Sequence, residues 1–254
     1  RLPSPFCLEA LGSCPGFSGD TRMAGLVSYE RRGGTAVITL CATEGAFPWG
    51  TEKAEHRWNP PTVAALGEAL DRAAADEGCS CVAVTGAGKF WSNGMDLIYL
   101  DAHSEAEGAA LGKLVDSVMA KILVFPIPTV AILNGHWCAA GGMMGLCFDH
   151  RVMNAERGFF FVPGVDLGIT YSPFQTAMMC AKLPASMHQD VIVYNSRRWD
   201  AADLVEKGVV TKAAPAAELM AAALEFAGSL APKGTGPARQ AMGPIKRLVY
   251  KHVL

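Results

Sequence analysis

Two glycine-rich segments, each placed directly after a short apolar run, constrain the fold of this chain more than any other feature. Residues 86–97 read GAGKFWSNGMDL after the run CVAVT, and residues 134–144 read NGHWCAAGGMM after PTVAIL. The apolar runs predict buried strands, and the small residues that follow predict tight turns into helices. Backbone N–H groups at the start of a helix lack partners inside it and point at whatever lies there.

Two such amides that converge on one carbonyl oxygen form an oxyanion hole. The alternative is that both segments are ordinary tight turns between a strand and a helix, and the pattern alone leaves both readings open. Neither segment has the glycine spacing of a dinucleotide-binding fingerprint or of a phosphate-binding P-loop. A nucleotide phosphate is therefore not the ligand that these glycines predict.

The remaining apolar patterns alternate between strand and helix, which is typical of an α/β fold with a parallel sheet. Alternation around a Gly-Gly pair predicts a β-hairpin at residues 26–29 and 35–41. Short apolar runs predict further strands at residues 81–85, 128–133, 149–153 and 158–162. A 3.6-residue period predicts helices at residues 60–71, 111–124, 201–207 and 216–230, with helices alone expected after residue 172.

The chain is predicted to fold as one domain, because no internal repeat or low-complexity linker divides it. Residues 1–22 stand apart: they are rich in Pro, Ser, Gly and Cys, show no clear period and do not begin with Met. We expect a leader or a disordered extension there and place the core of the fold at residues 23–183. A C-terminal helical region is expected at residues 184–254.

Charge and composition argue against several classes of protein. The 22 Lys+Arg and 24 Asp+Glu give a net charge of −2, which supplies no basic field for nucleic acid. A chain that is 50% hydrophobic does not have the composition of a disordered protein. The nearly uncharged stretch at residues 125–148 is broken by Pro, Asn and Gly, so we expect no membrane span. The eight cysteines show no C-x-x-C spacing and no His pair at zinc spacing, so we expect reduced thiols and no metal.

The glycine-rich segments resemble the two oxyanion segments of the crotonase (enoyl-CoA hydratase/isomerase) superfamily, and they are most similar to those of plant-type peroxisomal Δ3,Δ2-enoyl-CoA isomerases. The similarity extends to EHRWNP at residues 55–60, FDHRVM at 148–153, VDLG at 165–168, AKL at 181–183 and the stretch at 201–210. These motifs occur in the family's order and spacing over roughly residues 24–250.

The resemblance implies both a fold and a ligand. The fold is a spiral of stacked ββα turns over the core, with C-terminal helices that drive assembly into a homotrimer. The ligand is an acyl-CoA thioester, with CoA entering only as part of the substrate and no separate cofactor. The thioester oxygen is expected to be held by the main-chain N–H groups of Met95 and Ala140.

The resemblance also implies substrate-binding positions. The backbone at His56, Arg57 and Trp58 falls where the family grips the CoA adenine and the bent pantetheine. The other positions expected to contact substrate lie beside the two donors or further downstream, namely Asn93, Gly94, Gly141 and Gly164. The resemblance also places the basic residues of the last helix, Lys246, Arg247 and Lys251, where they either meet CoA phosphates or form a solvated basic face.

In isomerases of the family, a carboxylate takes the C2 proton of a 3-enoyl-CoA and returns it at C4, while the two amides stabilise the enolate oxygen. This chain departs from the family at both glutamate positions, which are occupied by Met143 and Gly164. The further Asp of the dienoyl-CoA isomerase branch is replaced by Ser172. Neither usual acid/base residue is therefore present.

Asp166 is the first candidate for the missing base. In an extended segment it points to the same side as Gly164, displaced by about 6–7 Å. The flexibility of Gly164 then lets the carboxylate, or a water that it holds, approach C2. The alternative is that Asp166 caps or pairs structurally, since relatives that keep the Glu also carry this Asp. His136 is a weaker candidate for the same reason.

Three functions remain open at this point. The first is an enoyl-CoA isomerase-like enzyme of fatty acid β-oxidation, and the second is an acyl-CoA-binding family member with weak or lost catalysis. A hydratase ranks last, because water addition requires two carboxylates. A peroxisomal location is expected from the resemblance, although residues 251–254 do not form a Ser-Lys-Leu-type address.

Overall fold

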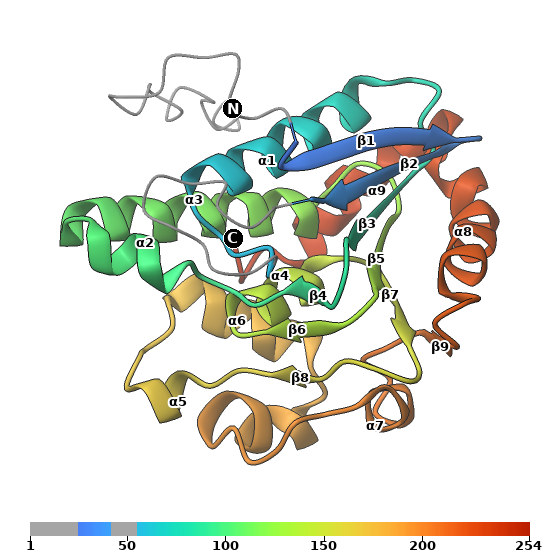
Figure 1. Cartoon of the computed structure of the whole chain (residues 1–254). Helices are drawn as coiled ribbons and strands as arrows, with labels where there is room; N and C mark the ends of the chain where they lie inside the picture. The colour runs from blue at the N-terminus through green and yellow to red at the C-terminus, as the bar shows by residue number, and fades with distance from the viewer. Residues whose placement is uncertain (1–24, 42–54) are drawn as a thin grey trace.

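Six strands form the larger of two sheets, in the order β1-β2-β3-β5-β7-β9 (Figure 1). The computed structural model describes residues 25–41 and 55–254. The leader expected at residues 1–22 lies outside the described residues. The strands of this sheet are β1 (Val27–Arg32), β2 (Thr35–Leu40), β3 (Cys81–Gly86), β5 (Thr129–Leu133), β7 (His150–Asn154) and β9 (Lys212–Ala214). The hairpin β1–β2 is antiparallel, as the Gly-Gly pair predicts, and every other pair is parallel.

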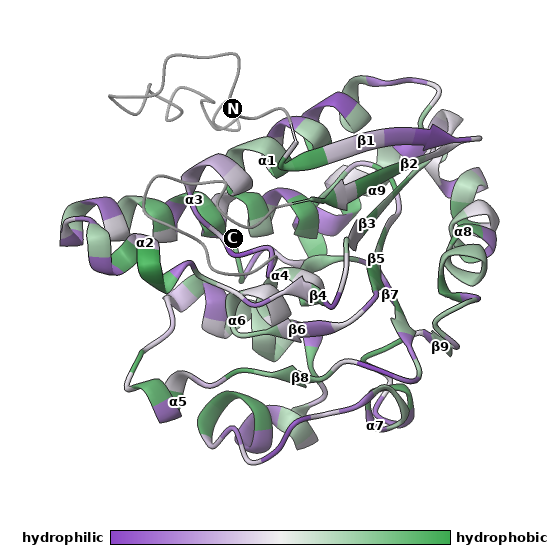
Figure 2. Cartoon of the chain, in the orientation of Figure 1, coloured by the Kyte–Doolittle hydropathy of each residue, from purple (hydrophilic) through white to green (hydrophobic). Residues whose placement is uncertain are grey.

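The central strands are buried on both faces, which explains their unbroken apolar sequences. Successive side chains of a strand point to opposite faces. In β3, Val82 and Val84 pack into the main core beneath α1 and α3, whereas Cys81 and Ala83 face the opposite side and pack with α8. At the edge of the sheet, β1 becomes hydrophilic along its second half and remains exposed (Figure 2).

Three very short strands form the smaller sheet, in the order β4-β6-β8 and all parallel. They are β4 (Phe90–Ser92), β6 (His136–Cys138) and β8 (Phe160–Phe161). Each follows a strand of the larger sheet and leads into a helix, so the core repeats a ββα unit. Two of the three lie inside the glycine-rich segments, where the sequence predicts only a turn.

Nine α-helices pack around the sheets of the described part of the chain. They are α1 (Pro60–Ala75), α2 (Leu97–Ala102), α3 (Glu105–Leu123), α4 (Ala140–Cys147), α5 (Gly164–Leu167), α6 (Pro173–Lys182), α7 (Ala201–Glu206), α8 (Leu219–Leu230) and α9 (Gly236–Val249). The expected helix after Pro60 is confirmed, and Asn59 caps it by accepting from the Thr62 amide at 3.1 Å. Among the helices of the described ranges, none has the length and hydropathy needed to cross a bilayer.

The chain beyond residue 172 is not purely helical, which corrects the sequence expectation. The three residues of β9 pair in parallel with β7 and complete the edge of the larger sheet. A strand this short gives no apolar period of its own, and only its neighbour β7 makes it a strand. The C-terminal region therefore contributes to the core sheet as well as to the helical layer.

Arg151 of β7 fixes the C-terminal end of α4. Its buried guanidinium donates to the carbonyls of Gly145, Leu146 and Phe148 at 3.3, 3.1 and 2.8 Å. The last carbonyls of a helix lack partners within it, and a cation there complements the helix dipole. The same guanidinium donates to the Val209 carbonyl at 2.6 Å, which ties α4 to the segment before β9.

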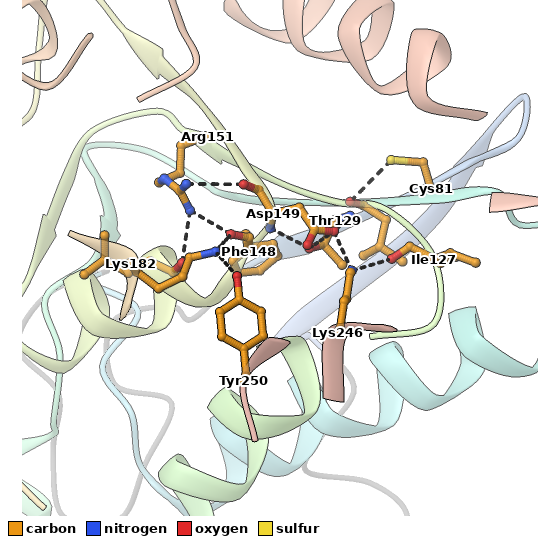
Figure 3. Close-up of polar contacts among 11 residues, drawn as sticks. Cys81, Ile127, Thr129, Phe148, Asp149, Arg151, Lys182, Lys246 and Tyr250 are labelled. Atoms are coloured by element: carbon orange, nitrogen blue, oxygen red, sulfur yellow. Dashed lines mark hydrogen bonds and ion pairs between the residues drawn. The ribbon is translucent and has the colours of Figure 1, made fainter. Parts of the chain in front are cut away.

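Ionic contacts attach the C-terminal helix α9 to the start of β7 (Figure 3). Asp149 accepts from the amide and hydroxyl of Thr129 at 2.9 and 3.1 Å, and it forms an ion pair with Lys246 of α9 at 2.6 Å. Lys182 donates to the Phe148 carbonyl at 2.8 Å. Burial, reinforced by the nearby Arg151, lowers the pKa of Lys182 to about 8. Because the ammonium group of Lys246 pairs with the Asp149 carboxylate, Lys246 does not lie on a solvated face.

We expect the substitution Lys182→Met to change how stability depends on pH. Folded Lys182 releases its proton near pH 8, whereas an unfolded Lys keeps it to about pH 10.4. Between these values the unfolded chain binds more protons, so this group makes the folded state more stable as the pH rises through 8. Denaturant unfolding at pH 7, 8 and 9 should show the unfolding free energy of the wild type rising relative to that of the variant.

The exposed Lys207 offers a matched control. The substitution Lys207→Met should leave the pH dependence of the wild type in place. The difference in unfolding free energy between the wild type and Lys182→Met should rise with pH. A difference that is flat or falls would contradict the lowered pKa of Lys182.

Candidate functional site

The candidate site lies at one edge of the smaller sheet, where its three parallel strands end. Parallel strands bring their carboxyl ends to the same edge, and ligands of such sheets bind outside that edge. β4 continues into Asn93, Gly94 and Met95, and β6 continues into Ala140 at the start of α4. β8 continues toward Gly164 at the start of α5. Residues far apart in the sequence therefore meet at one place.

The two glycine-rich turns are in direct contact. A Cβ atom built on Gly94 would lie 2.9 Å from Ala139 Cβ and 3.0 Å from the amide nitrogen of Ala140. Bond lengths along the chain then bring the amide nitrogens of Met95 and Ala140 within about 7 Å of each other. Two donors that share one oxygen lie at most about 6 Å apart. The structure therefore brings the two expected donors together, and their joint grip on one oxygen stays a prediction.

Neither amide is used in a hydrogen bond within the described part of the chain. Ala140 opens α4, so its N–H is one of those without an intrahelical partner. Around Met95, the hydrogen bonds to the neighbouring segment run from Trp58 N to Gly94 O at 2.7 Å and from Asp96 N to Trp58 O at 3.0 Å, and they bypass the Met95 amide. Among the described residues, neither amide has a hydrogen-bond acceptor.

Ala139 turns the chain sharply from β6 into α4. Its backbone angles are φ 50° and ψ −130°, a conformation that L-residues adopt only under strain, at a cost of about 1–3 kcal/mol. Its amide donates to Phe161 O at 2.9 Å, which fixes the turn against β8. On the other side, a Cβ on Gly141 would lie 2.5 Å from Ser92 O. The first turn of α4 therefore presses directly on β4, and only glycine fits there.

Residues 55–58 run beside the end of β4 and form the rim where CoA is expected. Asn93 N donates to Glu55 O at 2.9 Å, and the buried Glu55 carboxylate accepts from Asn93 Nδ2 at 2.7 Å and pairs with Arg57 at 2.8 Å. Sequence reasoning missed Glu55, because its contacts with Asn93 and Arg57 depend on how the chain turns at His56. Glu55 thus orients the guanidinium of Arg57 at the rim.

His56 is a buried and neutral part of this rim. Its backbone has a φ of 47°, and its Nδ1 lies 3.0 Å from Phe90 O and 3.1 Å from Trp91 O. Both partners are carbonyls, so Nδ1 carries the proton and donates. Burial lowers the pKa of His56. Its role follows from the backbone that it fixes, and contact of His56, Arg57 and Trp58 with CoA stays a prediction.

The two positions that lack the family's glutamates have different surroundings. Met143 is buried in the main core on α4. Gly164 is covered by Tyr171: a Cβ built on Gly164 would lie 2.2 Å from the Tyr171 hydroxyl oxygen. That hydroxyl accepts from the Gly164 amide at 2.9 Å and donates to Val162 O at 3.3 Å. No local pattern in the sequence points to Tyr171, because the contact spans seven residues across a turn.

The extended segment assumed for Asp166 is wrong, because Gly164–Leu167 forms a helical turn. Residues two apart on a helix do not face the same side. Gly164 is buried, whereas Asp166 is exposed and accepts a hydrogen bond from Asn195 Nδ2 at 2.5 Å. This placement is a structural pairing at the surface, and the role of Asp166 as a base gains no support from it.

The other polar candidates also have structural partners. The ring of His136 stacks on Phe159 with ring centres 5.6 Å apart, and burial followed by the charge of Lys89 lowers the pKa of His136. Burial raises the pKa of Cys138 to about 12, as it does for Cys81 and Cys147. No group of three or more His, Cys, Asp or Glu within residues 25–41 and 55–254 is arranged to hold a metal.

The sequence of this chain is similar to those of known proteins. The chain matches the family model described as Enoyl-CoA hydratase/isomerase over residues 55–251. Enoyl-CoA delta isomerase 2, peroxisomal, from Arabidopsis thaliana is 31% identical over 195 residues, which cover 74% of this chain and 77% of the relative. Enoyl-CoA delta isomerase 3 of the same plant is 30% identical over 193 residues, with the same two coverages.

A solved structure shows the same fold. A probable enoyl-CoA hydratase from Mycobacterium tuberculosis has a TM-score of 0.78 with this chain at 23% identity, and the likeness covers 90% of this chain and 89% of that one. At this identity the likeness concerns the fold alone. The α/β fold class with C-terminal helices, expected from the sequence, is confirmed, and its strands form two sheets that are parallel except for the hairpin β1–β2.

We expect Gly94→Ala to disturb the site, because the new Cβ would push against the Ala140 amide. The change combines backbone strain at a φ of 89° with overpacking, and we expect a loss of about 3 kcal/mol in stability. The measurements are the free energy of unfolding and the affinity for butyryl-CoA by calorimetry.

Gly88→Ala is the control, since Gly88 has a φ of 77° with open space around the added Cβ. It carries the same strain without the contact, so it should cost about 1 kcal/mol and leave affinity unchanged. Equal losses of affinity in both variants would show that the contact between the two turns is unimportant.

Proposed function

Because the chain belongs to the enoyl-CoA hydratase/isomerase family and has the α/β crotonase fold, we propose that it moves the double bond of a 3-enoyl-CoA to the 2-position in fatty acid β-oxidation. The observation that carries the proposal is the contact between the two glycine-rich turns at the carboxyl edge of the smaller sheet. The relatives from Arabidopsis thaliana, which are named as enoyl-CoA delta isomerases, support this reaction over others of the family.

In the proposed reaction, removal of a proton from C2 places negative charge on the thioester oxygen. The amides of Met95 and Ala140 stabilise that enolate in both halves of the reaction. Loss of one such donor typically costs about 3–4 kcal/mol of transition-state stabilisation. Because only main-chain N–H groups act, the side chains at these two positions are free of any chemical requirement.

Substrate binding is assigned to the surroundings of the two donors. Asn93 is held by Glu55, and Gly94 and Gly141 permit the close approach of the turns. His56, Arg57 and Trp58 form the rim on which we place the CoA moiety, and the guanidinium of Arg57 is held there by Glu55. Gly164 and its neighbour Asp166 lie at the third strand end, where the reacting carbons are placed.

The alternative is an acyl-CoA-binding protein with weak or lost catalysis. It is favoured by one specific observation: Met143 and Gly164 carry no carboxylate, and the exposed Asp166 turns toward Asn195. Hydration ranks behind both, because it requires two carboxylates, which activate the water and protonate the substrate. Assembly as a homotrimer and a peroxisomal location are proposals from the family, and the peroxisomal relative supports the location.

The test of function is conversion of trans-3-hexenoyl-CoA, followed by the absorbance of the conjugated 2-enoyl thioester and by mass spectrometry of the products. We expect slow but measurable isomerisation with no water addition, because the donors are present and the usual base is missing. Binding of the substrate without conversion would favour the alternative. Absence of binding would contradict both.

A further inference from the structure

We propose that the hydroxyl of Tyr171 transfers the proton at the position where residue 164 lacks a side chain. The inference deepens the proposed function and rests on it for the identity of the acyl-CoA ligand. It concerns a residue outside every motif discussed above, contributed by the segment between α5 and α6.

The ring of Tyr171 takes the space of the missing side chain. A Cβ atom built on Gly164 would lie 2.2 Å from the hydroxyl oxygen, 2.4 Å from Cζ and 2.6 Å from Cε1 of that ring. Contacts this short do not occur between real atoms, so residue 164 can carry a side chain only if Tyr171 leaves. The phenol therefore places an oxygen where the carboxylate-bearing side chain of the family would begin.

The phenol oxygen is fixed on both sides. It accepts from the amide of Gly164 at 2.9 Å and donates to the carbonyl of Val162 at 3.3 Å, so it bridges the segment that leaves β8. The next residue, Ser172, caps α6 and donates to Asp116 of α3 at 2.8 Å. Tyr171 is only partly buried, so its side chain is not sealed within the core.

The one phenol oxygen can both remove the C2 proton and deliver a proton to C4. The phenol first loses its proton to solvent. The phenolate then takes the C2 proton, and the C2–H electron pair forms the enolate whose oxygen lies on the amides of Met95 and Ala140. As the thioester carbonyl re-forms, a double bond forms between C2 and C3, and the former C3–C4 double bond takes the proton from Tyr171 at C4. One proton leaves the substrate and one returns.

The electrostatic surroundings predict an alkaline pH dependence. Burial raises the pKa of Tyr171, the Gly164 amide opposes this by stabilising the phenolate, and the charge of Asp166 on α5 raises the pKa further. From α3, Asp116 faces the neighbouring Ser172 and Gln175 side chains. The reactive phenolate should therefore grow with pH well above neutrality, whereas a carboxylate base is fully ionised above about pH 6.

The experiment measures exchange of the C2 protons of butyryl-CoA for solvent deuterium, alongside turnover of trans-3-hexenoyl-CoA. In the wild type we expect both rates to rise about tenfold per pH unit between pH 7.5 and 9.5. Tyr171→Phe should lower both by at least about 100-fold with little change in binding. Tyr194→Phe, at an exposed tyrosine on a neighbouring segment, should match the wild type.

Three further variants separate chemistry from structure. Asp166→Asn removes a negative charge near the phenol, so it should shift the pH profile to lower pH. Gly164→Glu alone should stay slow or unfold, because Tyr171 blocks the side chain. Gly164→Glu combined with Tyr171→Ala should regain turnover with a flat profile above pH 6.

The outcomes distinguish this inference from the proposed function. Turnover that survives Tyr171→Phe with an unchanged pH profile overturns the role of Tyr171 and leaves isomerisation standing. Deuterium exchange without turnover, lost in Tyr171→Phe, contradicts isomerisation and supports Tyr171. If Tyr171→Phe lowers the melting temperature but deuterium exchange persists, the role of Tyr171 is only structural. Absence of exchange in the wild type overturns the inference outright.

Discussion

The close approach of two main-chain turns is the constraint on which the rest of this structure depends. Gly94 lies against the Ala140 amide, and Gly141 lies against the Ser92 carbonyl, so α4 begins in contact with β4. A side chain at either glycine would separate them. The strained Ala139 aims the start of α4 into the site, and Arg151 holds its other end through the carbonyls of the last turn. An apolar helix of eight residues is thus fixed at both ends.

The third strand of the smaller sheet, β8, ends differently from what the family pattern predicts. At the end of β8, the chain offers a glycine backed by a phenol rather than a carboxylate. A phenol is a much weaker acid than a carboxylic acid, so at neutral pH the site stabilises an enolate better than it forms one. The same geometry is therefore compatible with slow isomerisation and with binding that has little catalysis. Which of the two occurs depends on how readily the hydroxyl of Tyr171 exchanges its proton.

The sequence predicted what is local and periodic. The hairpin β1–β2, the strands β3 and β5 and the helix after Pro60 follow from apolar patterns and breakers, and they are confirmed. It did not predict β4, β6 and β9, because strands of three residues exist only through their neighbours. The extended segment at Asp166 was wrong for a related reason, since Gly164 and the αL residue Gly168 close a helical turn. Glu55 and Tyr171 were missed because only tertiary contact reveals them.

The central claim is that the amides of residues 95 and 140 hold one thioester oxygen. A crystal structure with bound butyryl-CoA tests it most directly. If both amides hold the thioester oxygen, that oxygen lies about 3 Å from each nitrogen. An oxygen that contacts only one amide, or a ligand that places its thioester away from the carboxyl edge of the smaller sheet, would contradict it.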